Sequence, residues 1–465
     1  MTEPLPSYEQ LLDLVQQQQR QIEALTAEVA RLRAELDATR RAGKRQAAPF
    51  RKGPPNPQPK RPGRKAGDQH GTHGHRPPPP PEQIDEVHEA PLPEACPHCQ
   101  GRLVETEIGQ QFQTEIPRQP LRRQFNVHVG HCEQCGRRAQ GRHPLQTSDA
   151  LGAAASQVGP DAQAAVATLN KEAGLSHAKI SACLGSLFGI DLTRGASAQI
   201  VLRAAGRLEP AYEEIRQATR DAEQLSVDET GWRLGGQPAW LHVWVSEQAT
   251  CYAVARRRSA DVLEEVIGLD WEGVLIHDGF ASYDRFPQAF HQQCVAHLLR
   301  RAREMLETAA RGAVRFPRQV IDLFTGAVHL RNEFLAGRVP AAEWERARDE
   351  YELRLLPLLY RRRAGANETL ANHIWNHFAS WFTFLTSAAV PATNWEAEQA
   401  IRPAVVNRKV WGGNRTESGA QAQGILSSVL QTCKKQGKAA LDFVSQTLRA
   451  VGNRLLPTPI LLGTR

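Results

Sequence analysis

The sequence predicts a multidomain α/β protein, and three observations support this fold class. Residues 7–41 repeat apolar side chains with a helical period. Residues 96–135 contain two Cys-x-x-Cys pairs, and residues 222–285 change to the short alternating apolar runs of β-strands. At 465 residues the chain is long enough for two to four domains, at least one of them with a sizeable hydrophobic core.

Composition narrows the class of protein further. The net charge is +7 and the isoelectric point is about 9.1, which suits a nucleic-acid partner without requiring one. No apolar run reaches the ~18 residues that a membrane span needs, and residues 1–10 lack the basic and apolar regions of a secretory signal. Four of the eight cysteines form the two pairs, which favours a metal site in a reducing compartment over a disulfide framework. We therefore expect a cytoplasmic protein.

Residues 7–41 predict a coiled coil. Apolar residues recur at alternating spacings of four and three, with β-branched residues at heptad position a and leucine at d, a pattern that favours a parallel two-stranded coil. The seam consists of Leu11, Val15, Gln18, Ile22, Leu25, Val29, Leu32 and Leu36. Gln18 interrupts it at a d position. The alternative is a single amphipathic helix packed on its own domain; the coiled-coil interpretation predicts a homodimer.

Residues 42–88 form a linker rich in basic residues, proline, glycine and histidine. Residues 40–65 hold ten lysines and arginines and no acid, including Arg61, Arg64 and Lys65. Such a segment either contacts the phosphate backbone of DNA without reading its sequence or is a solvated tether. The histidines of residues 70–75 suit a spacer better than a metal site.

Residues 89–145 predict a zinc-binding domain. Cys96 and Cys99 form one knuckle, and Cys132 and Cys135 form the other. Four thiolates suit tetrahedral Zn²⁺, and each tight turn supplies two of them. Residues 110–130 alternate enough to predict a hairpin between the knuckles. The redox alternative lacks a βαβ context.

Residues 150–220 predict helices. Two amphipathic runs, 175–188 and 193–205, flank a turn at residues 189–191. They fit either a DNA-reading helix-turn-helix or an ordinary helical hairpin.

Residues 222–412 predict an α/β core. Strands are expected at residues 225–230, 238–246, 250–256 and 273–278, with Gly235 and Gly236 as a hairpin turn and a helix at 260–267. This order is that of a ribonuclease-H-like core. Residues 286–390 are mostly helical in pattern and predict an insertion, and residues 413–465 predict a helical tail.

Three acidic residues stand at the predicted ends of core elements. Asp228 and Asp278 each end a strand, and Glu398 lies in the first turn of a helix for which Asn394 is a plausible N-cap. Mg²⁺ prefers oxygen ligands, and two such ions ~3.5–4 Å apart can activate the attacking oxygen and stabilise the leaving oxygen of a phosphodiester. Spacing alone leaves Glu229 and Glu396 as equal alternatives, because the chain has 50 acidic residues.

The combined motifs resemble the large transposase of the insertion sequence 66 family, a DDE-type enzyme with a ribonuclease-H-like core. The likeness covers nearly the whole chain, from the coiled coil and linker to the helical tail. It rests on CPHC, CEQC, VDET, HDGFASYDRF, QQCVAHLLRR and NWEAEQAIRPAVVNRKVWGGNRTESGAQ. Two details depart from the family pattern, namely Ala392-Thr393-Asn394 before the last acidic helix and Gln399 within it.

The resemblance implies the site and the reaction. Asp228, Asp278 and Glu398 would be the catalytic residues and would bind two Mg²⁺ ions, or Mn²⁺ in their place, while Zn²⁺ would be structural. Arg402, Arg408 and Lys409 would contact DNA phosphates. The implied activity is strand cleavage at element ends followed by strand transfer into target DNA.

The implied partners are DNA, a second protomer and element-encoded helper proteins, in a bacterial cytoplasm and at the nucleoid. The alternatives are a zinc-dependent DNA-binding regulator that has lost catalysis and a stand-alone ribonuclease-H-like nuclease.

Overall fold

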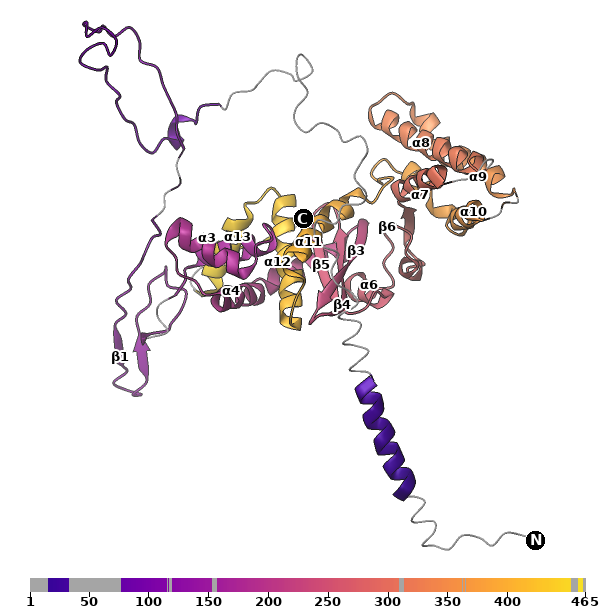
Figure 1. The fold of residues 1–465 in the computed structure, drawn as a ribbon, viewed down its shortest axis with the longest axis horizontal. Coiled ribbons are helices and arrows are strands. Elements are labelled where there is room, and N and C mark those ends of the chain that lie inside the picture. Colours follow the sequence, from indigo (N-terminus) through magenta and orange to yellow (C-terminus); the bar gives the residue numbers. More distant parts are fainter. Residues whose placement is uncertain are drawn as a thin grey trace.

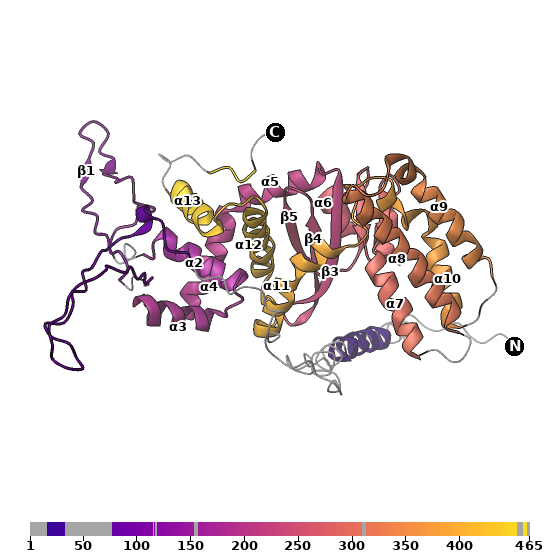
Figure 2. The same ribbon diagram turned by 90° about the horizontal axis from the view of Figure 1, so that it is seen from above.

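The computed structural model describes residues 16–32, 77–114, 116, 119–152, 157–308, 313–361, 363, 365–452 and 459–462. At its centre lies a five-stranded sheet (Figures 1 and 2). The strands are β3 (Gln224–Leu234), β4 (Gln237–Val245), β5 (Thr250–Ala255), β6 (Val274–His277) and β7 (Phe290–Gln293). Their order is β5-β4-β3-β6-β7, with β3, β4 and β5 antiparallel and β6 and β7 parallel to β3. This mixed sheet is consistent with the predicted ribonuclease-H-like core.

The hairpin between β3 and β4 turns at Gly235 and Gly236, whose φ angles are 60° and 78°. Two successive positive φ angles are the requirement of the tight turns that suit twisted hairpins, and glycine meets it without steric cost. β7 was not predicted as a strand, because its sequence FHQQ carries polar residues that are buried here, Gln292 and Gln293. The segment predicted to be helical therefore begins with a strand.

Helices cover both faces of the sheet. On one face, α11 (Trp395–Trp411) buries Ala397, Ile401 and Ala404 against β3 and β4. The other face packs against α5 (Glu209–Arg220) and α6 (Ala260–Ile267). The same core cluster continues through α2 (Pro160–Lys171), α4 (Arg194–Arg207), α12 (Glu417–Lys435) and α13 (Ala440–Gly452). Helices that precede the sheet in the sequence and helices that follow it thus share one hydrophobic core with it. Figure 2 shows α2, α4, α12 and α13 on the same side of the sheet.

The edge of β5 is closed by α12. Ser428 Oγ accepts a hydrogen bond from the Tyr252 N–H at 2.8 Å, and Thr432 Oγ1 accepts one from the Thr250 N–H at 3.0 Å. The two hydroxyls stand four residues apart, so they lie on one face of the helix. Residues 417–435 thereby satisfy backbone donors that an open sheet edge would leave unpaired.

The segment between β7 and α11 folds around a second core. It contains α7 (Val295–Thr308), α8 (Arg315–Leu335), α9 (Ala341–Leu359) and α10 (Ala366–Asn376). Phe324 stacks on Phe382 with ring centroids 5.0 Å apart, and Trp381 meets Phe324 edge-on. Figure 1 shows these helices gathered on one side of the sheet, beside β6.

Two predicted helices form a compact hairpin. They are α3 (His177–Phe188) and α4, joined through Gly189, which ends α3 with φ 61°. Ser176 and Thr193 cap their first turns by accepting backbone N–H bonds. One side of α4 is buried in the shared core, including Ile200 and Val201.

The amino-terminal segments are described in part. Residues 16–32 are helical and expose apolar side chains at Ile22, Leu25, Val29 and Leu32. The other residues of the predicted coiled coil, and the linker up to residue 76, lie outside the described residues. A short 3-10 helix follows at Pro81–Gln83. No helix among the described residues is long and apolar enough to span a membrane.

The cysteine-containing segment holds one hairpin. Its strands are β1 (Val129–His131) and β2 (Arg138–Gln140), which pair antiparallel on either side of the second cysteine pair. The prediction of a hairpin across residues 110–130 was therefore wrong, since the described part of that range has no strand before Val129. The tight turn of the knuckle itself brings its two flanks together.

Candidate active site

Asp228 and Asp278 are placed at one level by the parallel pairing of β3 and β6. Ser226 pairs with Ile276 as the last residues of that ladder. Asp228 lies on β3 two residues after Ser226, and Asp278 lies two residues after Ile276, just beyond β6. Both carboxyl groups are therefore at the same end of the ladder. Side chains two residues apart on a strand also lie on the same face of the sheet. The first two predicted acids are thus neighbours through backbone pairing alone.

The turn after β6 shapes the position of Asp278. Gly279 has φ 91°, and a Cβ there would lie 2.6 Å from Gln293 Oε1. Asp278 Oδ1 accepts a hydrogen bond from the Phe280 N–H at 3.0 Å. The Asp-Gly-Phe sequence therefore turns the chain sharply directly after the carboxylate.

Glu398 reaches the site from the first turn of α11, which crosses the face of β3 that carries Asp228. The carboxylates of Asp278 and Glu398 both affect the pKa of Asp228. Burial raises the pKa of Asp228 to about 7, repulsion from Glu229, Asp278 and Glu398 adds to the rise, and the Glu229 N–H opposes it. The three predicted acids therefore act on one another within one electrostatic environment.

Glu229 and Glu396, the two alternatives left by the sequence, are engaged elsewhere. Glu229 lies on the opposite face of β3, where its buried carboxylate accepts hydrogen bonds from Arg258 Nε at 2.7 Å and from the Tyr283 hydroxyl. Glu396 is exposed and lies 3.7 Å from Lys435 Nζ. Both carboxylates thus have cationic partners and point away from Asp228 or out to solvent.

Asn394 occupies the predicted N-cap position of α11, but its side chain makes no capping hydrogen bond. Its Nδ2 instead donates to the Val227 carbonyl oxygen at 2.6 Å, and its backbone N–H donates to Cys294 Sγ at 3.2 Å. The side chain of Asn394 therefore does not cap α11. It links α11 to β3 by a hydrogen bond to Val227, the residue next to Asp228.

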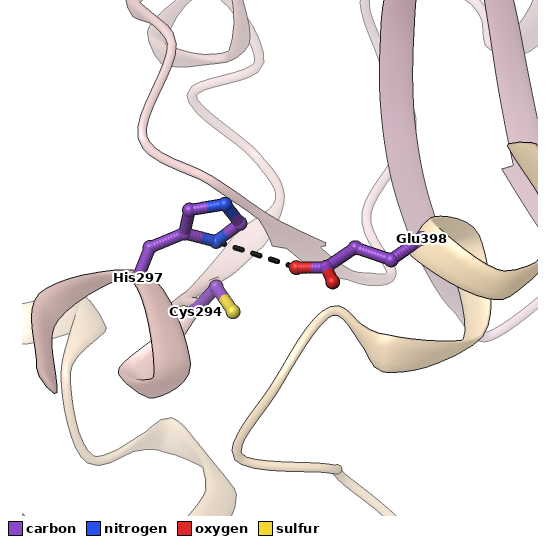
Figure 3. Close-up of side chains that lie close together, drawn as sticks. All are labelled: Cys294, His297 and Glu398. Carbon is purple, nitrogen blue, oxygen red and sulfur yellow. Dashed lines mark ion pairs between the residues drawn. The ribbon is translucent and has the colours of Figure 1, made fainter. Parts of the chain in front are cut away.

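A second group of side chains meets Glu398, and sequence reasoning gave it no role. Cys294, His297 and Glu398 offer ligand atoms that all lie within 4.8 Å of one another (Figure 3). His297 Nδ1 stands 3.6 Å from Glu398 Oε1. The neighbouring Cys294 side chain raises the pKa of His297, and the charges of Glu398 and Asp278 add to this effect. The available signal was a Cys-x-x-His spacing at the start of a helix.

Several buried polar atoms around these residues have no hydrogen-bond partner in the part of the chain that the structure describes. Among the described residues, the buried side-chain atoms without a hydrogen-bond partner include both amide atoms of Gln293, Nδ1 of His297 and Oδ1 of Asn394. Such atoms are costly to bury unless an ion or an ordered water satisfies them. Their presence beside the three acids fits a site that holds hydrated cations.

The predicted DNA-contacting residues differ in their exposure. Arg402 and Lys409 are exposed on α11. Arg408 is half-buried and donates to Thr230 Oγ1 at 3.4 Å, and burial lowers its pKa. Arg408 is therefore partly held against β3. Arg61, Arg64 and Lys65 lie outside the described residues.

The two cysteine pairs adopt the same local turn. Cys96 N–H donates to the Gly101 carbonyl and Cys132 N–H donates to the Arg137 carbonyl, both at 2.9 Å. Backbone N–H groups within each turn lower the pKa of Cys96 and of Cys132. Each turn is thus shaped to stabilise a thiolate. The structure does not bring the two pairs into one metal-sized group within the part of the chain that it describes.

One family model, described as the transposase IS66 family, matches residues 155–422. This chain belongs to the IS66 family of transposases. The matched range begins just before α2 and ends within α12, so it contains the whole sheet, the segment between β7 and α11, and all three predicted acids. Membership makes this a DDE transposase domain, whose family acts in DNA transposition. No curated protein matches the chain.

Proposed function

We propose that the chain catalyses metal-dependent DNA strand cleavage at the ends of its element and transfer of the freed strand into target DNA. The observation that supports this best is the convergence of Asp228, Asp278 and Glu398. Asp228 and Asp278 each lie two residues beyond the last pair of the β3–β6 ladder, and Glu398 lies in the first turn of α11, which crosses the same face of β3. The charges of Asp278 and Glu398 raise the pKa of Asp228, which supports the view that the three carboxyl groups lie close together.

The donor set suits Mg²⁺ or Mn²⁺, because it consists of carboxylates backed by unpartnered amide atoms. When bound, two such ions supply activation of the attacking oxygen and stabilisation of the leaving oxygen. Asp228, Asp278 and Glu398 would hold them. The strand and helix that carry these side chains fix their positions, and the tie from Asn394 to Val227 keeps α11 in place against β3. Cation binding would also relieve the repulsion that raises the pKa of Asp228.

The remaining parts of the chain would position DNA. Arg402 and Lys409 on the exposed side of α11 and the half-buried Arg408 are proposed to contact phosphates, together with Arg61, Arg64 and Lys65 of the linker. The Cys96, Cys99, Cys132 and Cys135 knuckles are proposed to hold structural Zn²⁺. The coiled coil of residues 7–41 would pair two protomers on two element ends. Helper proteins encoded by the element are a further class of partner.

The decisive experiment is strand cleavage of DNA that carries the element's own ends, with Mg²⁺ and with EDTA. Asp228→Asn and Glu398→Gln should lower cleavage by at least ~100-fold, because each removes a ligand charge, while DNA binding stays within about twofold of the unmodified chain. Glu396→Gln is the matched control, since it removes a glutamate two residues away that faces Lys435, and it should retain activity.

Cleavage by the Asp228→Asn chain at the original rate would refute the assignment of the site. DNA binding with no Mg²⁺-dependent cutting by the unmodified chain, also after helper proteins are added, would support the catalytically inactive regulator instead.

A further inference from the structure

We propose that Cys294, His297 and Glu398 form a binding site for a thiophilic divalent cation of the Zn²⁺ class, which shares only Glu398 with the carboxylate site. The three residues come from a strand end, a helix start and the facing helix α11 (Figure 3). A thiol, an imidazole and a carboxylate are the donors that Zn²⁺ takes in proteins, whereas Mg²⁺ does not favour sulfur.

Local backbone structure holds two of the proposed ligands, Cys294 and His297, close together. Cys294 directly follows β7 and His297 lies three residues on, in the first turn of α7. Residues three apart at the start of a helix share one face, and the His297 N–H donates to the Cys294 carbonyl oxygen at 3.2 Å, which fixes the turn that carries both side chains. The Cys294 N–H is bonded to the His277 carbonyl oxygen at 2.8 Å, which anchors the knuckle to β6.

The third ligand is held from the other side. Glu398 Oε1 stands 3.6 Å from His297 Nδ1. Two ligands each bound at ~2.0–2.1 Å with tetrahedral angles lie ~3.4 Å apart, so this separation is close to that of a shared ion. Three protein ligands leave a fourth position to water, as in open zinc sites.

Two independent features of His297 Nδ1 and Cys294 Sγ support a role as metal ligands. Nδ1 of His297 is buried and has no hydrogen-bond partner within the described part of the chain, although it faces a carboxylate. Sγ of the buried Cys294 accepts a hydrogen bond from the Asn394 N–H at 3.2 Å, so a donor already faces the sulfur. An apolar or purely structural role would require neither the orphaned nitrogen nor the donor aimed at sulfur.

Occupation of this site has a consequence that rests on the proposed function. Glu398 would serve both cation sites, so a Zn²⁺ ion held by Cys294 and His297 would draw this carboxylate away from Mg²⁺. Zn²⁺ should then inhibit strand cleavage in competition with Mg²⁺.

The first test measures binding alone and uses the full-length chain. Zn²⁺ is titrated against a chromophoric chelator, and the number of bound equivalents is compared between the unmodified chain, Cys294→Ser and Cys183→Ser. Cys183 is the matched control, because it is a half-buried cysteine on α3 away from both proposed zinc sites. We expect Cys294→Ser to bind one equivalent fewer and Cys183→Ser to bind the same number.

His297→Asn provides a second variant, because it leaves the buried cysteine in place, and it should also lose the equivalent. Thermal unfolding of each variant, followed by circular dichroism, identifies any that fails to fold. Equal Zn²⁺ stoichiometry in all folded variants would overturn the site.

The second test measures cleavage at fixed Mg²⁺ with rising Zn²⁺. The Zn²⁺ concentration for half-inhibition should rise at least ~10-fold in Cys294→Ser and stay unchanged in Cys183→Ser. Equal inhibition of both variants would overturn the competition. If the unmodified chain does not cleave DNA, the proposed function fails, but the binding test still decides the metal site.

Discussion

Neighbouring residues on β3 take opposite roles because side chains alternate across a strand. Asp228 faces α11 and Glu398, whereas Glu229 faces Tyr283 and Arg258 behind the sheet. Tyr283 belongs to the short helix at Ala281–Arg285, in the loop that follows Asp278. Glu229 therefore ties the strand of Asp228 to the loop of Asp278, and we interpret it as a positioning residue.

Replacement of Glu229 by glutamine should lower the free energy of unfolding by about 1–3 kcal/mol, because a buried hydrogen-bonded charge is lost while Arg258 stays. Urea unfolding measures this. Cleavage should also fall at least ~10-fold, since the two proposed metal ligands Asp228 and Asp278 lose their common support. Glu272→Gln, an exposed change at the opposite end of β6, should alter neither quantity. A fully active and equally stable Glu229→Gln chain would exclude the positioning role.

Lys171 makes stability depend on pH. It is buried, donates to Gln423 Oε1 at 2.9 Å and lies over the Trp411 ring, and burial lowers its pKa to about 7. The unfolded chain binds this proton up to the ordinary pKa of 10.5, so between pH 7 and pH 10.5 the unfolded state holds more protons. Stability from this residue therefore rises with pH across that window.

The expected gain from pH 7 to pH 9 is about 2 kcal/mol, at about 1.4 kcal/mol per pH unit. Lys171→Met should remove this part of the slope, as measured by urea unfolding at both pH values. Lys434→Met, at a half-exposed lysine paired with Glu172, should keep the slope of the unmodified chain. An identical slope in Lys171→Met would show that the lysine is not the source.

At the scale of elements, alternation and turn residues predicted much of the core. Apolar patterning located β3, β4 and β5, a continuous apolar run located β6, and two glycines marked the first hairpin. β7 was not predicted because its buried Gln292 is polar. In the folded chain its amide forms hydrogen bonds with the Trp381 carbonyl and the Phe384 N–H, which are distant in the sequence. The Cys294–His297–Glu398 group escaped for a similar reason. Glu398 is far from Cys294 and His297 in the sequence, and only the fold brings the first turn of α11 beside the start of α7.

The closure of β5 by α12 can be tested at one hydroxyl. Thr432→Val keeps the side-chain shape but leaves the buried Thr250 N–H without its acceptor, which should cost about 1–3 kcal/mol of unfolding free energy. Thr447→Val is the matched control, because that buried hydroxyl bonds only the Phe443 carbonyl of its own helix, and it should cost less. Equal costs, measured by urea unfolding, would mean that the edge contact contributes nothing.

At the scale of the whole molecule, one core joins segments that the sequence presents as separate. Helices α2 to α5, the sheet and the last two helices bury apolar residues together, and the family match covers most of this assembly. Local patterns identify helices and strands, but they do not show that residues 250 apart share a core. The described residues of the predicted zinc domain and coiled coil are not part of that core, so the roles of these two segments are separable by experiment.

The exposed apolar stripe of residues 16–32 argues for a partner outside the single chain. Ile22, Leu25, Val29 and Leu32 are 45–65% exposed and keep the heptad spacing. Burial of such a stripe against a second copy would supply the favourable energy that an isolated helix lacks. Light scattering should therefore give twice the chain mass of 51.5 kDa.

Leu25→Glu, at a seam position, should give the single-chain mass, while Ala27→Glu, on the outer face of the same turn, should keep the dimer. The melting temperature of the catalytic core should be the same in both variants. Cleavage of paired element ends should fall in Leu25→Glu while cleavage of a single end persists. A monomeric unmodified chain would reject the coiled coil, and an unchanged mass in Leu25→Glu would place the dimer contact elsewhere in the chain.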